Sequence, residues 1–177
     1  MGIGNFFGLL PESMTDAKLH GVELDDLTGR IAKQLYQKAD IAIDGFENTD
    51  HPDNYFDLAV GNVPFGEYKL HDRRYDRQNL LIHDYFITKT MDKVRPGGIV
   101  SFVTTKGTLD KKNSKVREAG DGFDLLAVLL LRRGHFQQLP VRRGNVLDSL
   151  GKLLGEVRSL NGQAGRLRLV AVHILPE

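Results

Sequence analysis

The chain has 177 residues, of which 41% are hydrophobic and 27% are charged, a composition typical of a globular protein with one sizeable core. The 24 Lys and Arg residues are balanced by 23 Asp and Glu residues, so overall charge gives no case for nucleic-acid binding. The chain has no cysteine, which excludes disulfides and thiolate metal sites. The sequence shows neither a bilayer-spanning apolar run nor a signal peptide, and we therefore expect a cytoplasmic protein without a membrane partner.

Strand and helix patterns alternate through the first 104 residues. Apolar runs predict strands at 18–24, 40–43, 56–61 and 99–103, and helical spacing predicts helices at 5–12, 25–35 and 80–94. In the second of these helices Leu27, Ile31 and Leu35 recur at helical spacing, after a cap at Asp25 or Asp26. The alternation predicts an α/β fold with a mainly parallel sheet.

The sequence changes character after Arg117. A uniformly apolar run follows at 123–131, apolar residues recur at helical spacing over 146–160, and a strand pattern covers 167–174. We therefore divide the chain into a core at 1–117 and an extension at 118–177, with one helix and one or two strands.

The strongest chemical signal is the run Asn62-Val63-Pro64-Phe65 at the end of the buried strand 56–61. The carboxyl edge of a parallel sheet is where ligand sites form in α/β proteins. There the Asn62 side-chain oxygen can accept a hydrogen bond from an exocyclic amine, Pro64 fixes the turn, and Phe65 offers a stacking face for a planar base. For this short motif alone, a plain turn with a core Phe is the more common interpretation.

This motif resembles the Asn-Pro-Pro-Tyr/Phe motif of DNA adenine methyltransferases, with Val63 in place of the first Pro. The longer stretch at 60–113 is similar to the methylase segment of large helicase-methylase proteins of bacterial plasmids and mobile elements. The resemblance runs from Met1 to about Arg117. It implies a Rossmann-like, class I fold that uses S-adenosyl-L-methionine (AdoMet) to methylate adenine in DNA, as restriction-modification enzymes do, with Asn62, Pro64 and Phe65 at the target base.

The resemblance also implies a set of cofactor-binding residues. Gly2 and Gly4 would belong to the turn around the methionine part of AdoMet, and Glu23 would accept hydrogen bonds from the ribose. Asp44 and Phe46 would lie near the adenine ring. All of these residues except Asp44 have a structural alternative: a flexible terminus for the glycines, an acid at a helix start for Glu23, and a core position for Phe46.

The loop that follows the motif carries basic residues with Tyr68 and Tyr75 among them, a composition that suits binding to phosphates and bases. Its candidate nucleic-acid-binding residues are Lys69, Arg73, Arg74, Tyr75 and Arg77. The alternative is a solvated loop in which Asp72 and Asp76 neutralise much of the charge.

Two departures from the family pattern leave the activity open. The strand that precedes the AdoMet turn in the family is not found before Met1, so the sheet is expected to lack its first strand. Residues 118–177 do not follow the family pattern. The alternatives to methyl transfer are therefore a non-catalytic, truncated remnant and a DNA-binding accessory domain.

Overall fold

The computed structural model describes residues 1–64, 66–103, 128–132, 135–139 and 168–173, and it has a mixed α/β architecture. Its main sheet has five strands in the order β2-β1-β7-β3-β4, and every neighbouring pair is parallel. These strands are β1 (Lys18–Glu23), β2 (Asp40–Ile43), β3 (Phe56–Asn62), β4 (Val94–Val103) and β7 (Arg168–His173). A separate antiparallel pair consists of β5 (Val128–Arg132) and β6 (His135–Leu139).

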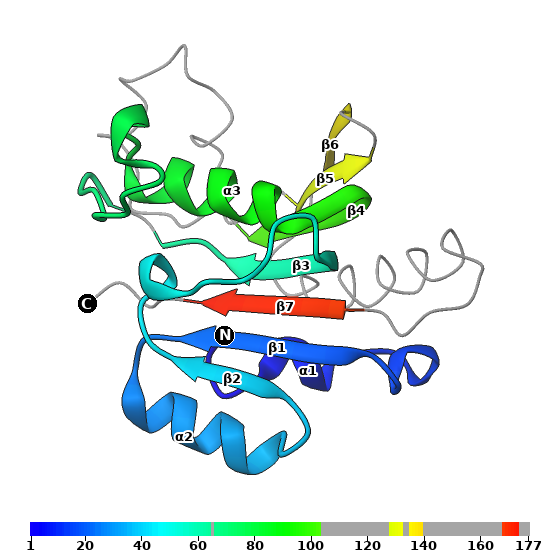
Figure 1. Cartoon of the computed structure of the whole chain (residues 1–177). Helices are drawn as coiled ribbons and strands as arrows, with labels where there is room; N and C mark the ends of the chain where they lie inside the picture. Colours follow the sequence, from blue (N-terminus) through cyan, green and yellow to red (C-terminus); the bar gives the residue numbers. More distant parts are fainter. Residues whose placement is uncertain (65, 104–127, 133–134, 140–167, 174–177) are drawn as a thin grey trace, which may run out of the picture.

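The strand nearest the end of the chain lies in the middle of the main sheet (Figure 1). β7 pairs with β1 on one side and with β3 on the other. The expectation of a sheet that lacks its central strand is therefore wrong for this structure. In a doubly wound sheet with strand order 3-2-1-4-5, β7 holds the position of the first strand. This arrangement is compatible with a Rossmann-like fold, although the boundary at residue 117 stays a prediction.

The helices are shorter than the sequence predicts at two places. α1 covers Asn5–Gly8 and is followed by a 3-10 turn, η1 (Glu12–Met14), whereas one helix was expected over 5–12. α3 covers Ile82–Lys93, and β4 begins at the next residue instead of at residue 99. α2 covers Asp26–Leu35, and Asp25 is its cap, because Oδ1 of Asp25 accepts a 2.7 Å hydrogen bond from the Thr28 N–H.

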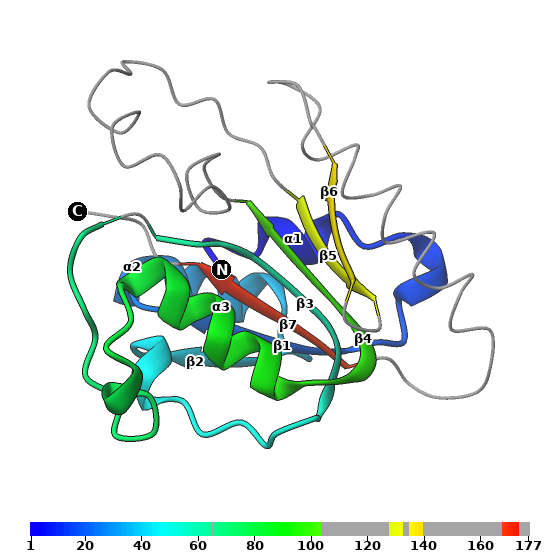
Figure 2. The ribbon, with the colours of Figure 1, turned by 90° about the horizontal axis from the view of Figure 1, so that it is seen from above.

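The two faces of the main sheet are covered by different helices, which Figure 2 shows from above for α1 and α3. Successive strand residues point to opposite faces. One face buries Leu58, Val60, Leu169 and Ala171 with side chains of α1 and α2, and the other buries Ala59, Val100 and Val170 with side chains of α3. No helix among the residues described is long and apolar enough to cross a membrane.

Candidate functional site at the carboxyl edge of the sheet

The carboxyl ends of the five parallel strands form one row across the sheet. In register, this row runs from Ile43 through Glu23, His173 and Asn62 to Val103. From β1 the chain steps outward to β2, and from β3 it steps outward to β4 in the opposite direction, with β7 between them. Such a reversal of direction is where open α/β sheets bind ligands, so Glu23 and Asn62 flank the expected crevice.

Asn62 carries an unsatisfied polar atom at this edge. The residue is half-buried, and its Oδ1 has no accessible surface and no hydrogen-bond partner in the structure described. Leaving a buried acceptor unpaired costs about 1–3 kcal/mol. Val63 and Pro64 are buried behind it, whereas Phe65 lies outside the described residues. The side-chain oxygen of Asn62 is therefore a hydrogen-bond acceptor without a donor in the part of the chain that the structure describes.

Glu23 is fully engaged with the chain's own backbone. Its Oε2 accepts a 2.6 Å hydrogen bond from the Gly2 N–H and a 2.8 Å contact from the Met1 amine, and its Oε1 accepts from the Asp25 N–H at 3.1 Å. Burial alone would raise the pKa of Glu23, but the Met1 amine and these N–H donors lower it. Burial lowers the pKa of the Met1 amine to about 5. In this structure Glu23 fastens the residue 1–4 turn to the end of β1.

The turn at residues 1–4 requires its glycines. Gly2 and Gly4 have φ values of 61° and 98°, in the left-handed region that residues other than glycine rarely adopt. A Cβ on Gly4 would also collide with the ring of Tyr36. The Gly2 N–H contacts Glu23, and the backbone conformation of the turn is by itself a reason for both glycines. Their contact with a cofactor stays a prediction.

Asp44 and Phe46 follow β2 at the same edge but differ in exposure. Asp44 is exposed, and hydrogen bonds from the Asn48 side chain and the Gly45 N–H to its Oδ1 lower its pKa. Phe46, in the 3-10 turn η2 (Phe46–Asn48), is 2% exposed and packs against Phe86 with ring centroids 5.0 Å apart. The ring of Phe46 is therefore part of the core in this structure.

Lys89 is a buried residue that the sequence analysis overlooked. Its side chain is 4% exposed, and its Nζ donates to the carbonyl oxygens of Phe46 and Glu47 and to Oδ2 of Asp72, at 2.8, 3.2 and 2.9 Å. Burial lowers the pKa of Lys89, and the Asp72 carboxylate opposes that shift. The available signal was its spacing, because Lys89 follows Tyr85 by four positions on the buried face of α3.

Three of the five loop residues expected at nucleic acid are engaged within the protein: Arg74, Tyr75 and Lys69, whose Nζ donates to Asn79. Arg74 makes a bidentate contact with Asp53: its two terminal guanidinium nitrogens donate to Oδ1 and Oδ2 of Asp53, at 2.9 and 2.6 Å. One of these nitrogens also lies 3.3 Å from Oδ2 of Asp92. Tyr75 is 4% exposed, and its hydroxyl donates to Asp92 at 2.8 Å. Arg73 and Arg77 are exposed, so the loop presents them to solvent.

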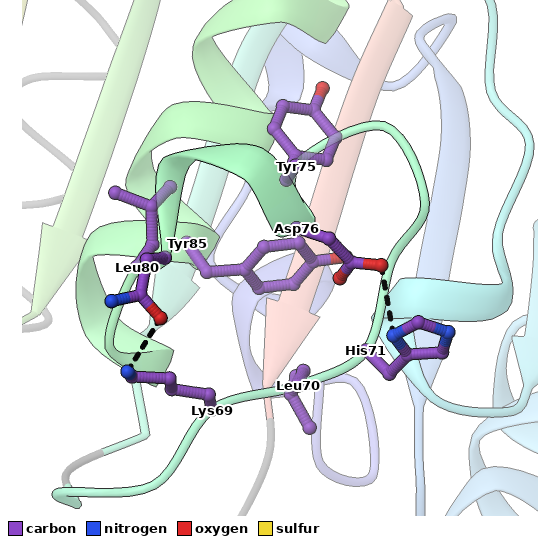
Figure 3. A pocket seen from close by; sticks show the side chains of 8 residues that line it. Lys69, Leu70, His71, Tyr75, Asp76, Leu80 and Tyr85 are labelled. Carbon is purple, nitrogen blue, oxygen red and sulfur yellow. Dashed lines mark hydrogen bonds and ion pairs between the residues drawn. The ribbon is translucent and has the colours of Figure 1, made fainter.

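The same loop and α3 line an open pocket of about 280 Å³. Its lining includes the ring of Tyr85 and the side chains of Lys69, His71 and Asp76 (Figure 3). Nζ of Lys69 donates to Asn79 at 2.6 Å, and Nδ1 of His71 lies 2.8 Å from Asp76. The hydroxyl of Tyr85 is bonded to Asp72 and is not offered to a ligand. An aromatic wall with a polar rim suits a small planar ligand.

The comparisons with known proteins give one partial relationship and correct one expectation. The chain is 30% identical over 98 residues to "Defense against restriction protein B" of Escherichia phage P1, an alignment that covers 52% of this chain and 4% of the phage protein. No protein-family model and no solved structure match. The recognition of the chain as a DNA adenine methyltransferase is therefore wrong: no such family matches, and the phage protein's name refers to restriction and not to methyl transfer.

Proposed function

We propose that the carboxyl edge of the main sheet is a methyl-transfer site that uses AdoMet and acts on the exocyclic amine of adenine in DNA. The observation that carries the proposal is the buried, unpaired Oδ1 of Asn62 beside the central strand. An amine donor would satisfy that oxygen, which it would reach only if the residues that cover the oxygen moved. The proposal rests on this geometry and not on family membership, and it includes a class I methyltransferase arrangement of the Rossmann-like sheet and a cytoplasmic location.

On the substrate side, Asn62 would be the main catalytic residue. Its oxygen would accept a hydrogen bond from the adenine amine and would stabilise the positive charge that develops on the nitrogen during transfer. Pro64 would hold the turn rigid, and Phe65 would stack on the base once it has left the helix. No covalent intermediate and no strong general base are needed for a direct displacement.

On the cofactor side, AdoMet would supply the electrophilic methyl group. The glycines at 2 and 4 leave the backbone of the turn without Cβ atoms, and the exposed Asp44 carboxylate offers an acceptor at the end of β2. These features fit the cofactor. Glu23 has its oxygens occupied by N–H donors, so we assign it a positioning role: it holds the turn in place and would reach the ribose only if the turn moved.

DNA is proposed as the partner on two grounds. Arg73 and Arg77 are exposed in the loop that follows Asn62, where they can contact phosphates. Restriction, the subject of the phage relative's name, acts on DNA. That relative is far longer than the matched segment, which covers 4% of it, so the activity of the whole phage protein is not carried over to this chain.

A second candidate is a non-catalytic domain, and the burial of the Glu23 carboxylate, which three N–H donors already hold, favours it. A third, a DNA-binding accessory domain, would use Arg73 and Arg77 alone.

Two binding assays, calorimetry with AdoMet and titration with DNA, distinguish these three hypotheses. The proposal expects AdoMet binding that Glu23→Ala abolishes, together with N6-methyladenine in DNA treated with protein and AdoMet. Salt-dependent DNA binding without AdoMet binding would establish the accessory domain, and no binding in either assay would establish the non-catalytic domain.

A further inference from the structure

α2 exposes an apolar stripe that the sheet does not cover. Leu27, Ile31 and Leu35 are 65%, 40% and 59% exposed, and Leu24, just before the helix, is 52% exposed. Residues four positions apart lie on one face of a helix, so the three helical side chains form a continuous row. Contiguous exposed apolar side chains of this kind commonly mark a surface that binds another protein, whereas single exposed apolar residues do not.

The stripe is exposed because α2 uses a different face for its own sheet. The buried residues of the helix are Gly29 and Ala32. A Cβ at position 29 would meet Ile43 of β2, which means that the small face of α2 already lies close against the sheet. The large apolar side chains are left on a neighbouring face, and burial of each would contribute about 1.5–3 kcal/mol.

The stripe is symmetric about Ile31. Leu27 and Leu35 stand four residues before and four residues after it, and they are the same residue type. A second α2 that runs antiparallel across a two-fold axis at Ile31 would place each Leu27 against the partner's Leu35. It would also place Ile31 against its own copy, the isologous contact that a two-fold dimer requires.

The charges along α2 favour the same arrangement. Asp25 and Asp26 lie at the start of the helix, and Lys33 lies in its last turn. An antiparallel partner brings the acidic start of each helix beside the basic end of the other, and it also opposes the two helix dipoles. A parallel arrangement would instead pair like charges at both ends.

We propose that this chain forms a homodimer through the Leu27–Ile31–Leu35 stripe of α2, with the two-fold axis beside Ile31. The inference is independent of the methyl-transfer proposal, because the stripe lies on a helix surface and not at the Asn62 edge. One helix pair buries a small area, so we expect a weak dimer with a micromolar dissociation constant.

The absence of cysteine in the chain allows a clean cross-linking test. In Ile31→Cys the two thiols would meet at the axis, at a separation that packed helices and disulfide geometry both allow. Met91→Cys is the matched control, because Met91 is 39% exposed against 40% for Ile31 but lies on α3. Under mild oxidation with diamide, Ile31→Cys should form covalent dimer about ten-fold faster than Met91→Cys. Equal rates would overturn the proposal.

A pair of variants tests the antiparallel register. Leu27→Cys alone should cross-link slowly, whereas the double variant Leu27→Cys with Leu35→Cys should form dimers joined between positions 27 and 35, as peptide mapping would detect. Cross-links between two copies of position 27 would contradict the antiparallel register.

Sedimentation distinguishes a second copy from the chain's own segment at 146–160 as the occupant. The wild-type protein should show a concentration-dependent dimer, and Ile31→Glu should be monomeric. Below the dissociation constant of the dimer, the two proteins should have the same melting temperature. A wild-type monomer that Ile31→Glu destabilises would mean that an internal segment covers the stripe, and the dimer proposal would be wrong.

Discussion

Arg168 and Asp57 are joined by two contacts across 111 residues of chain. The backbone N–H of Arg168 donates to Oδ2 of Asp57 at 2.8 Å, and its Nε lies 3.2 Å from the same oxygen. The other carboxylate oxygen accepts from Nε of Arg95, in β4. One buried carboxylate thus ties together the amino ends of β3, β7 and β4, and it fixes the register in which β7 enters the middle of the sheet.

Replacement of this carboxylate should weaken the whole fold. Asp57→Ala removes the acceptor from one backbone N–H and two guanidinium groups, and we expect a loss of about 3 kcal/mol in the free energy of unfolding. Urea denaturation followed by circular dichroism would measure it. Asp26→Ala is the control, because the Asp26–Arg30 pair is exposed at 74% and 70% and should contribute less than about 0.5 kcal/mol. Equal effects would show that β7 is not anchored at Asp57.

The central position of β7 could not be read from the sequence. The strand pattern itself was recognisable, because 167–174 alternates between apolar and other residues, and β7 does form at Arg168–His173. Its partners are set by contacts far apart in the chain, such as Asp57 with Arg168, and no local propensity encodes them. β3 was predictable because it is a short apolar run that a turn ends, whereas β1, with Lys18, His20 and Glu23, gave a weaker pattern.

His51 should make the protein less stable in mild acid. Burial lowers the pKa of His51 below its usual 6.5, and the neighbouring His20 ring, 5.9 Å away, lowers it further. The unfolded chain therefore binds the proton at a higher pH than the native state does. The associated stability is complete above about pH 6.5 and declines as the pH falls toward the lower, native pKa.

Melting temperatures measured between about pH 5 and pH 8 would detect this effect. His51→Gln keeps a polar side chain of similar length without the titration, and its melting temperature should change less over this range than that of the wild type. His71→Gln is a suitable control, since the His71 side chain is 85% exposed. A wild-type slope that persists in His51→Gln would assign the effect to another group.

Lys89 should be needed for the position of the segment after β2. Lys89→Met leaves the Asp72 carboxylate and two backbone carbonyls without their shared donor, and we expect a loss of about 3 kcal/mol in stability. Chemical denaturation would measure the loss, with the exposed Lys38→Met as a control that should be nearly neutral. A neutral Lys89→Met would mean that apolar packing alone holds Phe46.

Substitutions in the loop after β3 should distinguish residues that contact DNA from residues that stabilise the fold. Replacement of both Arg73 and Arg77 by Ala should weaken DNA binding, reduce the slope of affinity against salt by about two, and leave the melting temperature unchanged. Arg74→Ala should instead lower the melting temperature, because Arg74 is held by Asp53 and Asp92. Fluorescence anisotropy at several salt concentrations, with thermal denaturation, would test both. If all variants bind DNA with the affinity of the wild type, the loop does not contact DNA as proposed.

The candidate site was predictable in position but not in detail. Asn62 and Pro64 were found from an apolar strand followed by a Pro-constrained turn, and they lie at the carboxyl edge where the strand ends. The engagement of Glu23 by Gly2 and Asp25 was not foreseeable, because it depends on how the residue 1–4 turn folds back on β1. The burial of Phe46 against Phe86 likewise depends on the packing of η2 and α3.

The most direct test of the account is Asn62→Ala, followed by two readouts on the same preparation. We expect N6-methyladenine formation from AdoMet and DNA by the wild type and its loss in the variant. We also expect a melting temperature no lower than that of the wild type, because the deleted oxygen has no partner to lose and its burial without a partner is unfavourable. Undiminished methylation in Asn62→Ala, or none by the folded wild-type protein, would contradict the account.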